Sequence, residues 1–139
     1  MKSIFIALIV LLTLAACQPT PDYADMPFEK YPVYNGQDLG LSYTPQQSVF
    51  KIWSPPAQEA RVHLYAEGEG GLPLRSQDMR QDKKSGVWTA RFDEDLKGQF
   101  YAFQVKIKGE WLAEVPDPYA KAVGVNGDRG MVVDLAETN

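Results

Sequence analysis

The sequence predicts an all-β chain that folds as an immunoglobulin-like β-sandwich after a signal peptide and a Pro-containing tether. The clearest evidence is residues 101–108, where large apolar residues alternate with smaller or polar ones over the length of one strand. Similar short stretches follow each other along the chain, separated by Gly, Pro, Asn and Asp. No stretch has the period of an amphipathic helix, and at most a single turn fits residues 117–123.

Four further stretches complete the predicted sandwich. Residues 49–53 alternate and stop at Pro55-Pro56, because proline cannot donate a hydrogen bond to a sheet. Residues 61–66 and 87–92 alternate in the same way, and residues 131–135 would form a closing strand. Gly109, which can adopt positive φ without strain, predicts a hairpin turn after the long strand.

Residues 1–16 predict a lipoprotein signal peptide. Residues 4–14 form an unbroken apolar run, shorter than the roughly 20 residues that a membrane-spanning helix needs. A short buried helix is the alternative interpretation of this run. The sequence Leu14-Ala15-Ala16-Cys17 follows directly and resembles the bacterial lipobox. That resemblance implies lipidation of Cys17 and, with Gln18 next to it, anchoring in the outer membrane of a Gram-negative bacterium.

Residues 17–31 are predicted to form a lipidated tether, because Pro19, Pro21 and Pro27 exclude a helix. The remaining domain would span residues 32–139. Cys17 is the single cysteine of the chain, so this domain would fold without an internal disulfide. The formal net charge of −4 becomes −5 once Lys2 leaves with the signal peptide. Since no basic cluster is present, the sequence argues against nucleic acid as a partner.

No catalytic, metal-binding or cofactor-binding pattern is present in the sequence. The hydrolase motifs Gly-x-Ser-x-Gly and His-Glu-x-x-His are absent, as is a Cys/His cluster for zinc. His63 is the single histidine, and its place in a strand favours a surface or half-buried position over a catalytic triad. The dense carboxylates at residues 93–95 are typical of a solvated loop rather than of a glycosidase pair. We therefore predict no catalytic residue, no metal and no cofactor in this chain.

Tryptophan side chains remain as candidates for binding, because sugars stack their apolar faces on aromatic rings. Trp53 and Trp88 lie within strand patterns, where packing in the core is the default interpretation. Trp111 follows the Gly109 turn and has polar neighbours. Trp111 is therefore the tryptophan expected to be exposed.

Several motifs resemble the N-terminal part of bacterial type I pullulanases, debranching enzymes of the α-amylase type. The motifs, which together cover essentially residues 32–139, are Tyr34–Gly40 followed by Tyr43-Thr44-Pro45, Phe50–Pro55, Gly86-Val87-Trp88, Asp117–Gly127 and Arg129–Leu135. The resemblance implies a sandwich of carbohydrate-binding module family 48, followed by a (β/α)₈ barrel that hydrolyses α-1,6 links in pullulan, glycogen or starch. Because such a barrel takes about 250 residues, these 139 residues would lack the catalytic domain.

The resemblance also implies individual site residues. Trp111 matches a tryptophan that stacks on sugar in related glycogen-binding modules, and Asn126 matches an asparagine that contacts the sugar. A second stacking tryptophan of those modules has no counterpart in the loop at residues 67–71. In many debranching enzymes this module packs against the barrel, and Tyr119 and Val123 would belong to that contact.

Three functions remain open at this point. The first is a module that binds α-glucan, weakly because it has one aromatic platform, and is anchored to the outer membrane. The second is a structural module that packs on the barrel of the parent enzyme and has no sugar affinity. The third is a generic immunoglobulin-like surface lipoprotein. The first predicts an exposed Trp111 beside polar groups, the second predicts an exposed apolar patch around Tyr119 and Val123, and the third predicts neither.

Overall fold

The computed structural model describes residues 21–138, so the predicted signal peptide and Cys17 lie outside the described part. The described residues contain strands and short 3₁₀ turns but no α-helix, which confirms the all-β prediction. No helix in this part of the chain has the length and apolar character required to cross a membrane. The strands are β1 (Gly40–Thr44), β2 (Gln47–Trp53), β3 (Glu59–Tyr65), β4 (Arg75–Asp78), β5 (Arg80–Asp82), β6 (Val87–Phe92), β7 (Phe100–Ile107), β8 (Glu110–Trp111) and β9 (Gly130–Met131). The 3₁₀ turns are η1 (Phe28–Lys30), η2 (Val125–Gly127) and η3 (Leu135–Thr138).

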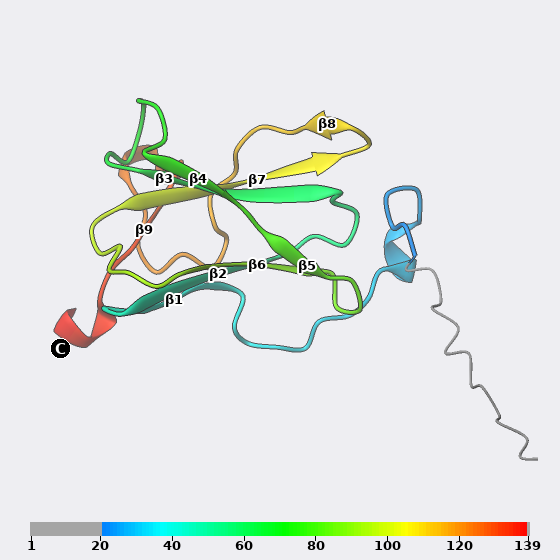
Figure 1. Cartoon of the computed structure of the whole chain (residues 1–139), viewed down its shortest axis with the longest axis horizontal. Coiled ribbons are helices and arrows are strands. Elements are labelled where there is room, and N and C mark those ends of the chain that lie inside the picture. The colour runs from blue at the N-terminus through cyan, green and yellow to red at the C-terminus, as the bar shows by residue number, and fades with distance from the viewer. Residues whose placement is uncertain (1–20, 139) are drawn as a thin grey trace, which may run out of the picture.

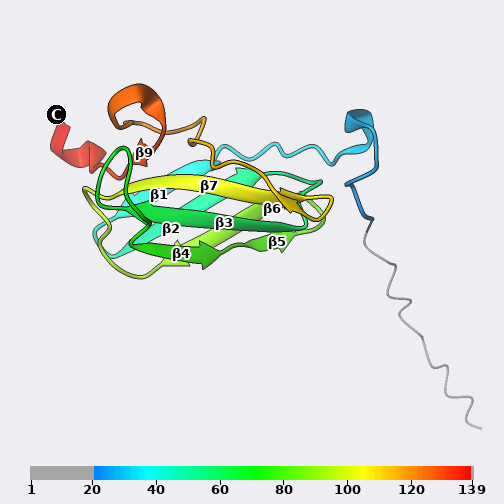
Figure 2. The same ribbon diagram turned by 90° about the horizontal axis from the view of Figure 1, so that it is seen from above.

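The strands form two antiparallel sheets that pack face to face as a sandwich (Figure 1). Sheet A has the order β1-β2-β6-β5, and sheet B has the order β4-β3-β7-β8, with β9 also paired to β7. The turn η1 lies at one end of the sandwich, and the C-terminal turn η3 lies at the opposite end (Figures 1 and 2). Strand β7 is the centre of sheet B, because it pairs with β3 on one side and with β8 and β9 on the other.

Most strands that the alternating pattern predicts are present. Residues 49–53 lie in β2, residues 61–65 lie in β3, the predicted strand 87–92 matches β6, and the long stretch corresponds to β7. The hairpin after β7 turns at Lys108 and Gly109, whose φ angles are 51° and 80°. Two consecutive positive φ angles match the right-handed twist of the flanking strands, as in a type I′ turn.

The predicted closing strand 131–135 is shorter than expected. Strand β9 ends at Met131, and Leu135 already begins η3. The Asp134 carboxylate accepts a hydrogen bond from the backbone N–H of Ala136 at 3.0 Å, a local turn bond that competes with strand pairing. Segment 117–123 holds a single turn, closed by the backbone N–H of Ala120 on the carbonyl of Asp117 at 3.1 Å.

The core lies between β2 and β6 of sheet A and β3 and β7 of sheet B. Phe50 of β2 is fully buried, and its ring centroid lies 4.9 Å from that of Tyr101 and 6.4 Å from that of Phe103, both on β7. Trp88 is also buried, and its indole N–H donates to the carbonyl of Ser54 at 2.9 Å. Trp88 is therefore a core residue, as its strand pattern predicted. The contacts of Phe50 with the two rings on β7 join the two sheets.

The segment before β1 contacts the sandwich instead of standing apart from it. The Asp25 carboxylate pairs with the Lys108 ammonium at 2.8 Å, and the ring of Tyr23 lies 6.1 Å from that of Tyr31. Phe28 and Tyr31 both place their rings edge-on against Trp53, with centroid separations of 6.1 and 6.2 Å. Part of the predicted tether, from Tyr23 onward, therefore packs against the end of the sandwich.

Candidate functional site

The outer face of sheet B carries the first candidate site. Side chains alternate along a strand, so residues that point away from the core on β3 meet their partners on β7. The outward pairs are Glu59 with Lys106, Arg61 with Gln104, His63 with Ala102, and Tyr65 with Phe100. Figure 2 looks onto this sheet, with β4, β3 and β7 nearest the viewer. The face therefore presents a row of polar and aromatic side chains.

Trp111 lies at one end of this face, on β8 opposite Lys106. It is half-buried rather than fully exposed. The guanidinium carbon of Arg61 lies 4.4 Å from the centre of the indole, and the Lys106 ammonium lies 5.9 Å from it. Arg61 is held there by its ion pair with Asp78 at 2.6 Å. A guanidinium therefore covers one face of Trp111, and a sugar ring must use the other face or displace Arg61.

His63 lies in the middle of the face and is more buried than its sequence context suggested, at 7% exposure. Its Nε2 contacts the Gln104 side-chain oxygen at 3.0 Å, and its Nδ1 contacts the Ser76 hydroxyl at 2.6 Å. Because an amide oxygen only accepts, Nε2 carries the proton and Nδ1 accepts from Ser76. The Gln104 amide in turn donates to the carbonyl of Leu112 at 2.9 Å. His63 thus helps to fix the backbone next to Trp111 and has no catalytic geometry.

Tyr65 and Arg129 form a second polar cluster at the other end of the face. The Arg129 guanidinium is buried on the ring of Tyr65, 3.3 Å from its centre. It donates to the backbone carbonyls of Glu67 and Gly70, at 2.8 and 2.9 Å, and so fixes the loop between β3 and β4. The Tyr65 hydroxyl donates to the Glu114 carboxylate at 2.5 Å. Burial, aided by that bond, raises the pKa of Tyr65 to about 12, so the phenol stays protonated.

Asn126 belongs to a loop beside this cluster. It is exposed, adopts a positive φ of 69°, and donates from its amide to the Glu69 carboxylate at 2.8 Å. The two loops pack backbone against backbone, since a Cβ added to Gly124 would lie 2.8 Å from the Cα of Gly68. Glycine at both positions is therefore required for this close approach.

The two predicted sugar contacts, Trp111 and Asn126, lie at opposite ends of sheet B. Trp111 is opposite Lys106, whereas the loop of Asn126 leads into β9, where Met131 pairs with Phe100. Lys106 and Phe100 are separated by about 20 Å at the usual rise of a β-strand. A single sugar ring cannot contact both side chains, so a joint site would have to hold an extended chain of several sugars.

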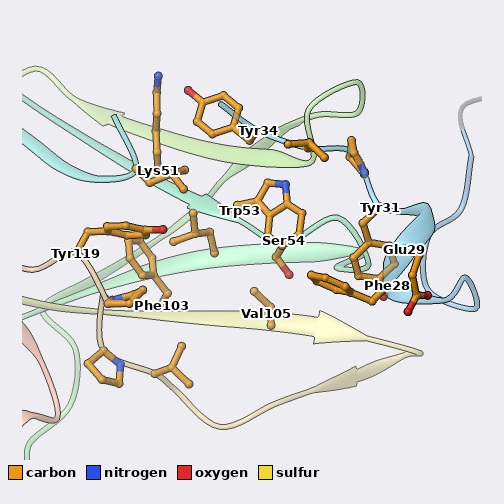
Figure 3. Close-up of a pocket in the computed structure, with 17 residues that line it drawn as sticks. Phe28, Glu29, Tyr31, Tyr34, Lys51, Trp53, Ser54, Phe103, Val105 and Tyr119 are labelled. Atoms are coloured by element: carbon orange, nitrogen blue, oxygen red, sulfur yellow. The ribbon is translucent and has the colours of Figure 1, made fainter. Parts of the chain in front are cut away.

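A second candidate site is an apolar groove of about 700 Å³ at the open edge of the sandwich. It runs between the segment before β1, the end of β2, and the segment after β8. In Figure 3, Phe28, Tyr31 and Trp53 gather at one end of the groove, and Tyr119 and Phe103 lie at the other. Residues Phe28, Glu29, Tyr31, Pro32, Val33, Tyr34, Leu39, Lys51, Ile52, Trp53, Ser54, Phe103, Val105, Val115, Pro116, Pro118 and Tyr119 line it.

A buried carboxylate supports the Tyr119 end of the groove. Asp117 accepts from the Tyr101 hydroxyl at 2.7 Å and from the backbone N–H of Tyr119 at 2.8 Å. Burial and the neighbouring Asp117 charge raise the pKa of Tyr101 well above its usual range. Gly40 packs closely against Tyr119, since a Cβ at position 40 would lie 2.7 Å from the Cβ of Tyr119. Asp117 therefore fixes the direction in which the chain presents Tyr119.

Tyr119 and Val123, predicted to be interdomain contacts, are both exposed, at 53% and 54%. Tyr119 lines the apolar groove, whereas Val123 does not. Val123 instead forms an isolated bridge with Gly130, near the Asn126 loop. The structure therefore places these two residues in different surroundings.

Comparison with known proteins identifies the chain. Residues 38–120 match the family model described as carbohydrate-binding module 48 (isoamylase N-terminal domain). The chain belongs to this family. A pullulanase of Bacillus subtilis is 40% identical over 100 residues, which cover 72% of this chain and 13% of that protein. A pullulanase of Klebsiella pneumoniae is 33% identical over 108 residues, covering 70% and 10% respectively.

Solved structures agree with the fold of this CBM48 module. The pullulanase of Paenibacillus barengoltzii, solved in complex with maltohexaose and α-cyclodextrin, superposes with a TM-score of 0.75 at 43% identity. That match covers 83% of this chain and 17% of that structure. The chain therefore spans less than a fifth of the length of each of these three relatives. Family membership argues against the hypothesis of a generic immunoglobulin-like lipoprotein.

The CBM48 module shows no metal-binding cluster of His, Cys, Asp and Glu within residues 21–138. The carboxylates at residues 93–95 are exposed, and Asp93 and Asp95 bond to Arg91 and Tyr43. Loop 67–71, which carries no aromatic ring, is held by Arg129 and offers no second stacking platform. Sequence reasoning missed the apolar groove, because its walls come from segments far apart in the chain.

Proposed function

We propose that this chain is the starch- and glycogen-associated module of a type I pullulanase-like enzyme that hydrolyses α-1,6 links, and that catalysis lies outside these residues. Family membership and the likeness to pullulanases carry the proposal. The outer face of sheet B is the candidate α-glucan site, with Trp111 as its aromatic platform and Asn126 at its far end. Since Arg61 covers one face of Trp111 and loop 67–71 lacks a second platform, the affinity for glucan is weak.

A titration tests the glucan site directly. Residues 18–139 are titrated with maltoheptaose and with a branched glucan while tryptophan fluorescence is followed. We expect saturable binding that falls about tenfold or more in Trp111→Ala, which corresponds to a loss of about 1.4 kcal/mol. Leu72→Ala is the matched control, because Leu72 is an exposed apolar residue directly after loop 67–71 with no assigned role. No saturation at millimolar sugar would exclude the glucan site.

A packing role against the catalytic barrel is the second candidate function. The observation that favours it is the exposure of Tyr119 in the apolar groove, since a patch of large exposed apolar side chains marks a contact with another surface. Val123 is also exposed, but it lies outside the groove. This role does not require sugar affinity. If residues 18–139 fail to bind glucan, the packing role accounts for the module.

The proposal includes export and anchoring through lipid on Cys17 in the outer membrane of a Gram-negative bacterium. The support is the apolar run at residues 4–14, directly followed by the lipobox-like sequence that ends at Cys17. Several acyl chains on one residue give stable anchoring, at about 0.8 kcal/mol for each buried methylene. In cells labelled with radioactive palmitate, we expect label in the wild-type protein and none in Cys17→Ser. Label retained in Cys17→Ser would contradict the anchor.

A further inference from the structure

Side chains from three strands of sheet B meet on its outer face. Asp78 belongs to β4, Arg61 to β3 and Trp111 to β8, and β7 lies between β3 and β8. Neighbouring strands are about 4.8 Å apart, so β3 and β8 are separated by about 10 Å. The guanidinium carbon of Arg61 is nevertheless 4.4 Å from the centre of the Trp111 indole. The two side chains therefore reach toward each other across β7.

Electrostatic attraction holds the Arg61 guanidinium at this place. The guanidinium is attracted to the electron-rich face of the indole, and its Nε donates to the Asp78 carboxylate at 2.6 Å. The side chains of Arg61 and Asp78 are 37% and 74% exposed. Water and salt therefore screen the ion pair, and both interactions of the guanidinium are weak enough to be reversible.

A sugar ring and the guanidinium compete for the indole of Trp111. Each binds by lying over the aromatic ring, the sugar through its apolar C–H face and the guanidinium through its charge. Since the indole extends across β7, that strand limits access to the ring from one side. Lys106 of β7 lies directly opposite Trp111, and its ammonium is 5.9 Å from the ring centre. Arg61 occupies the ring at the shorter distance of 4.4 Å.

We propose that Arg61, held by Asp78, is a reversible cover on the face of Trp111 that α-glucan uses, and that this cover sets the glucan affinity of the site. The inference rests on the proposed function, because it concerns the same site. Binding then exchanges the contact between guanidinium and indole for the stacking of a sugar ring. The affinity is therefore lower than that of an uncovered tryptophan, and it rises when Arg61 is removed or its charge is screened.

The first test measures the affinity for maltoheptaose with and without the cover. It uses residues 18–139, the whole chain apart from the predicted signal peptide and the lipidated cysteine. Arg61→Ala removes the guanidinium and leaves Trp111 in place, so the dissociation constant should fall about two- to fivefold. Equal dissociation constants in the wild type and in Arg61→Ala would overturn the proposal.

Arg91→Ala is the matched control for the loss of an exposed arginine and its ion pair. The Nε of Arg91 donates to the Asp93 carboxylate at 2.7 Å, nearly the distance found between Arg61 and Asp78. Arg91 lies on β6 of sheet A, away from Trp111. We expect Arg91→Ala to bind maltoheptaose like the wild type, and a gain as large as that of Arg61→Ala would count against the cover.

A second measurement needs no variant of the cover. Raising sodium chloride from about 0.1 M to about 1 M shortens the Debye length from about 10 Å to about 3 Å. Salt weakens the attraction of Arg61 for Asp78 and the indole, whereas maltoheptaose is uncharged. The affinity of the wild type should therefore rise with salt, and that of Arg61→Ala should stay constant. A flat or falling affinity in the wild type, or an equal rise in both chains, contradicts the proposal.

Access to Trp111 is measured without any sugar. Acrylamide, a small neutral quencher, should reduce the tryptophan fluorescence of Arg61→Ala more strongly than that of the wild type. The difference should disappear when both chains also carry Trp111→Phe. Absence of the difference would overturn the cover and leave the glucan site intact. If neither the wild type nor Arg61→Ala binds maltoheptaose, the glucan site itself is wrong and the inference fails with it, so the two failures are distinguishable.

Discussion

The outer face of sheet B and the apolar groove lie on the same sandwich but differ in which side chains lack a partner. On the outer face, the polar groups of Arg61, His63, Tyr65 and Arg129 are bonded to neighbouring side chains, to backbone or to aromatic rings. In the groove, the few polar groups are paired at the border, while large apolar side chains such as Val33 and Val115 remain in solvent. The polar groups of the outer face are already hydrogen-bonded in the absence of a ligand. The exposed apolar side chains of the groove, in contrast, gain free energy when another surface removes them from water.

The two surfaces also differ in how closely their tryptophans are packed. Substitution of these tryptophans should give the largest change in the free energy of unfolding. Trp53→Ala removes an indole that packs against Phe28 and Tyr31 and bonds to Ser85, and should cost about 2–3 kcal/mol of unfolding free energy. Trp111→Ala removes a half-buried indole and its contact with Arg61, and should cost about 1 kcal/mol. Urea unfolding of residues 18–139 measures both. Equal losses would mean that the segment before β1 does not pack on Trp53.

Asp117 bonds to the Tyr101 hydroxyl and to the backbone of Tyr119 at one end of the groove. Its substitution should have an intermediate effect on the free energy of unfolding. Asp117→Ala leaves the buried Tyr101 hydroxyl without its acceptor, so we expect a loss of about 1–3 kcal/mol in the free energy of unfolding. Asp117→Asn keeps an acceptor and serves as the control, with a smaller loss. In a double-mutant cycle, Tyr101→Phe should recover part of the loss, because it removes the unpaired hydroxyl. Additive effects of the two changes would contradict the bond.

The Tyr65 cluster on the outer face should give the smallest effect, visible at high pH. Folding raises the pKa of Tyr65 from 10.0 to about 12, so the folded chain holds this proton more tightly than the unfolded chain. The contribution to stability is therefore complete below pH 10 and is lost as the pH rises toward 12. Thermal unfolding between these pH values should show a shallower decline in Tyr65→Phe than in the wild type. An identical decline would show that the phenol titrates normally in the folded chain.

The strands could be predicted from the sequence wherever one face is buried and the other is solvated. Strand β6 shows this clearly, since Trp88, Ala90 and Phe92 are buried while Thr89 and Arg91 are not. In β7 the match is only partial, because Ala102 is buried along with Tyr101 and Phe103. Strands β4 and β5 were missed, because Arg75–Asp78 and Arg80–Asp82 are almost entirely polar edge strands whose pattern does not differ from that of a loop. Their pairing is decided by the neighbouring strands β3 and β6.

The sequence could identify the candidate site residues but could not predict which side chains surround them. It singled out Trp111 by its position after a turn, but Arg61, which covers the ring, is fifty residues away and arrives only through the pairing of β3 with β7. His63 was expected at the surface or half-buried, and it is buried because Ser76 and Gln104 on the two neighbouring strands satisfy its ring nitrogens.

By itself, the sequence determined the all-β class, the hairpin at Gly109, the absence of catalytic motifs and the resemblance to pullulanases, because each of these depends on short stretches of chain. The tertiary structure alone decided the separation of Trp111 from Asn126 and the existence of the apolar groove. Both depend on which strands become neighbours and where the segment before β1 packs. Such long-range contacts are set by the burial of side chains from distant parts of the chain, which no local pattern records.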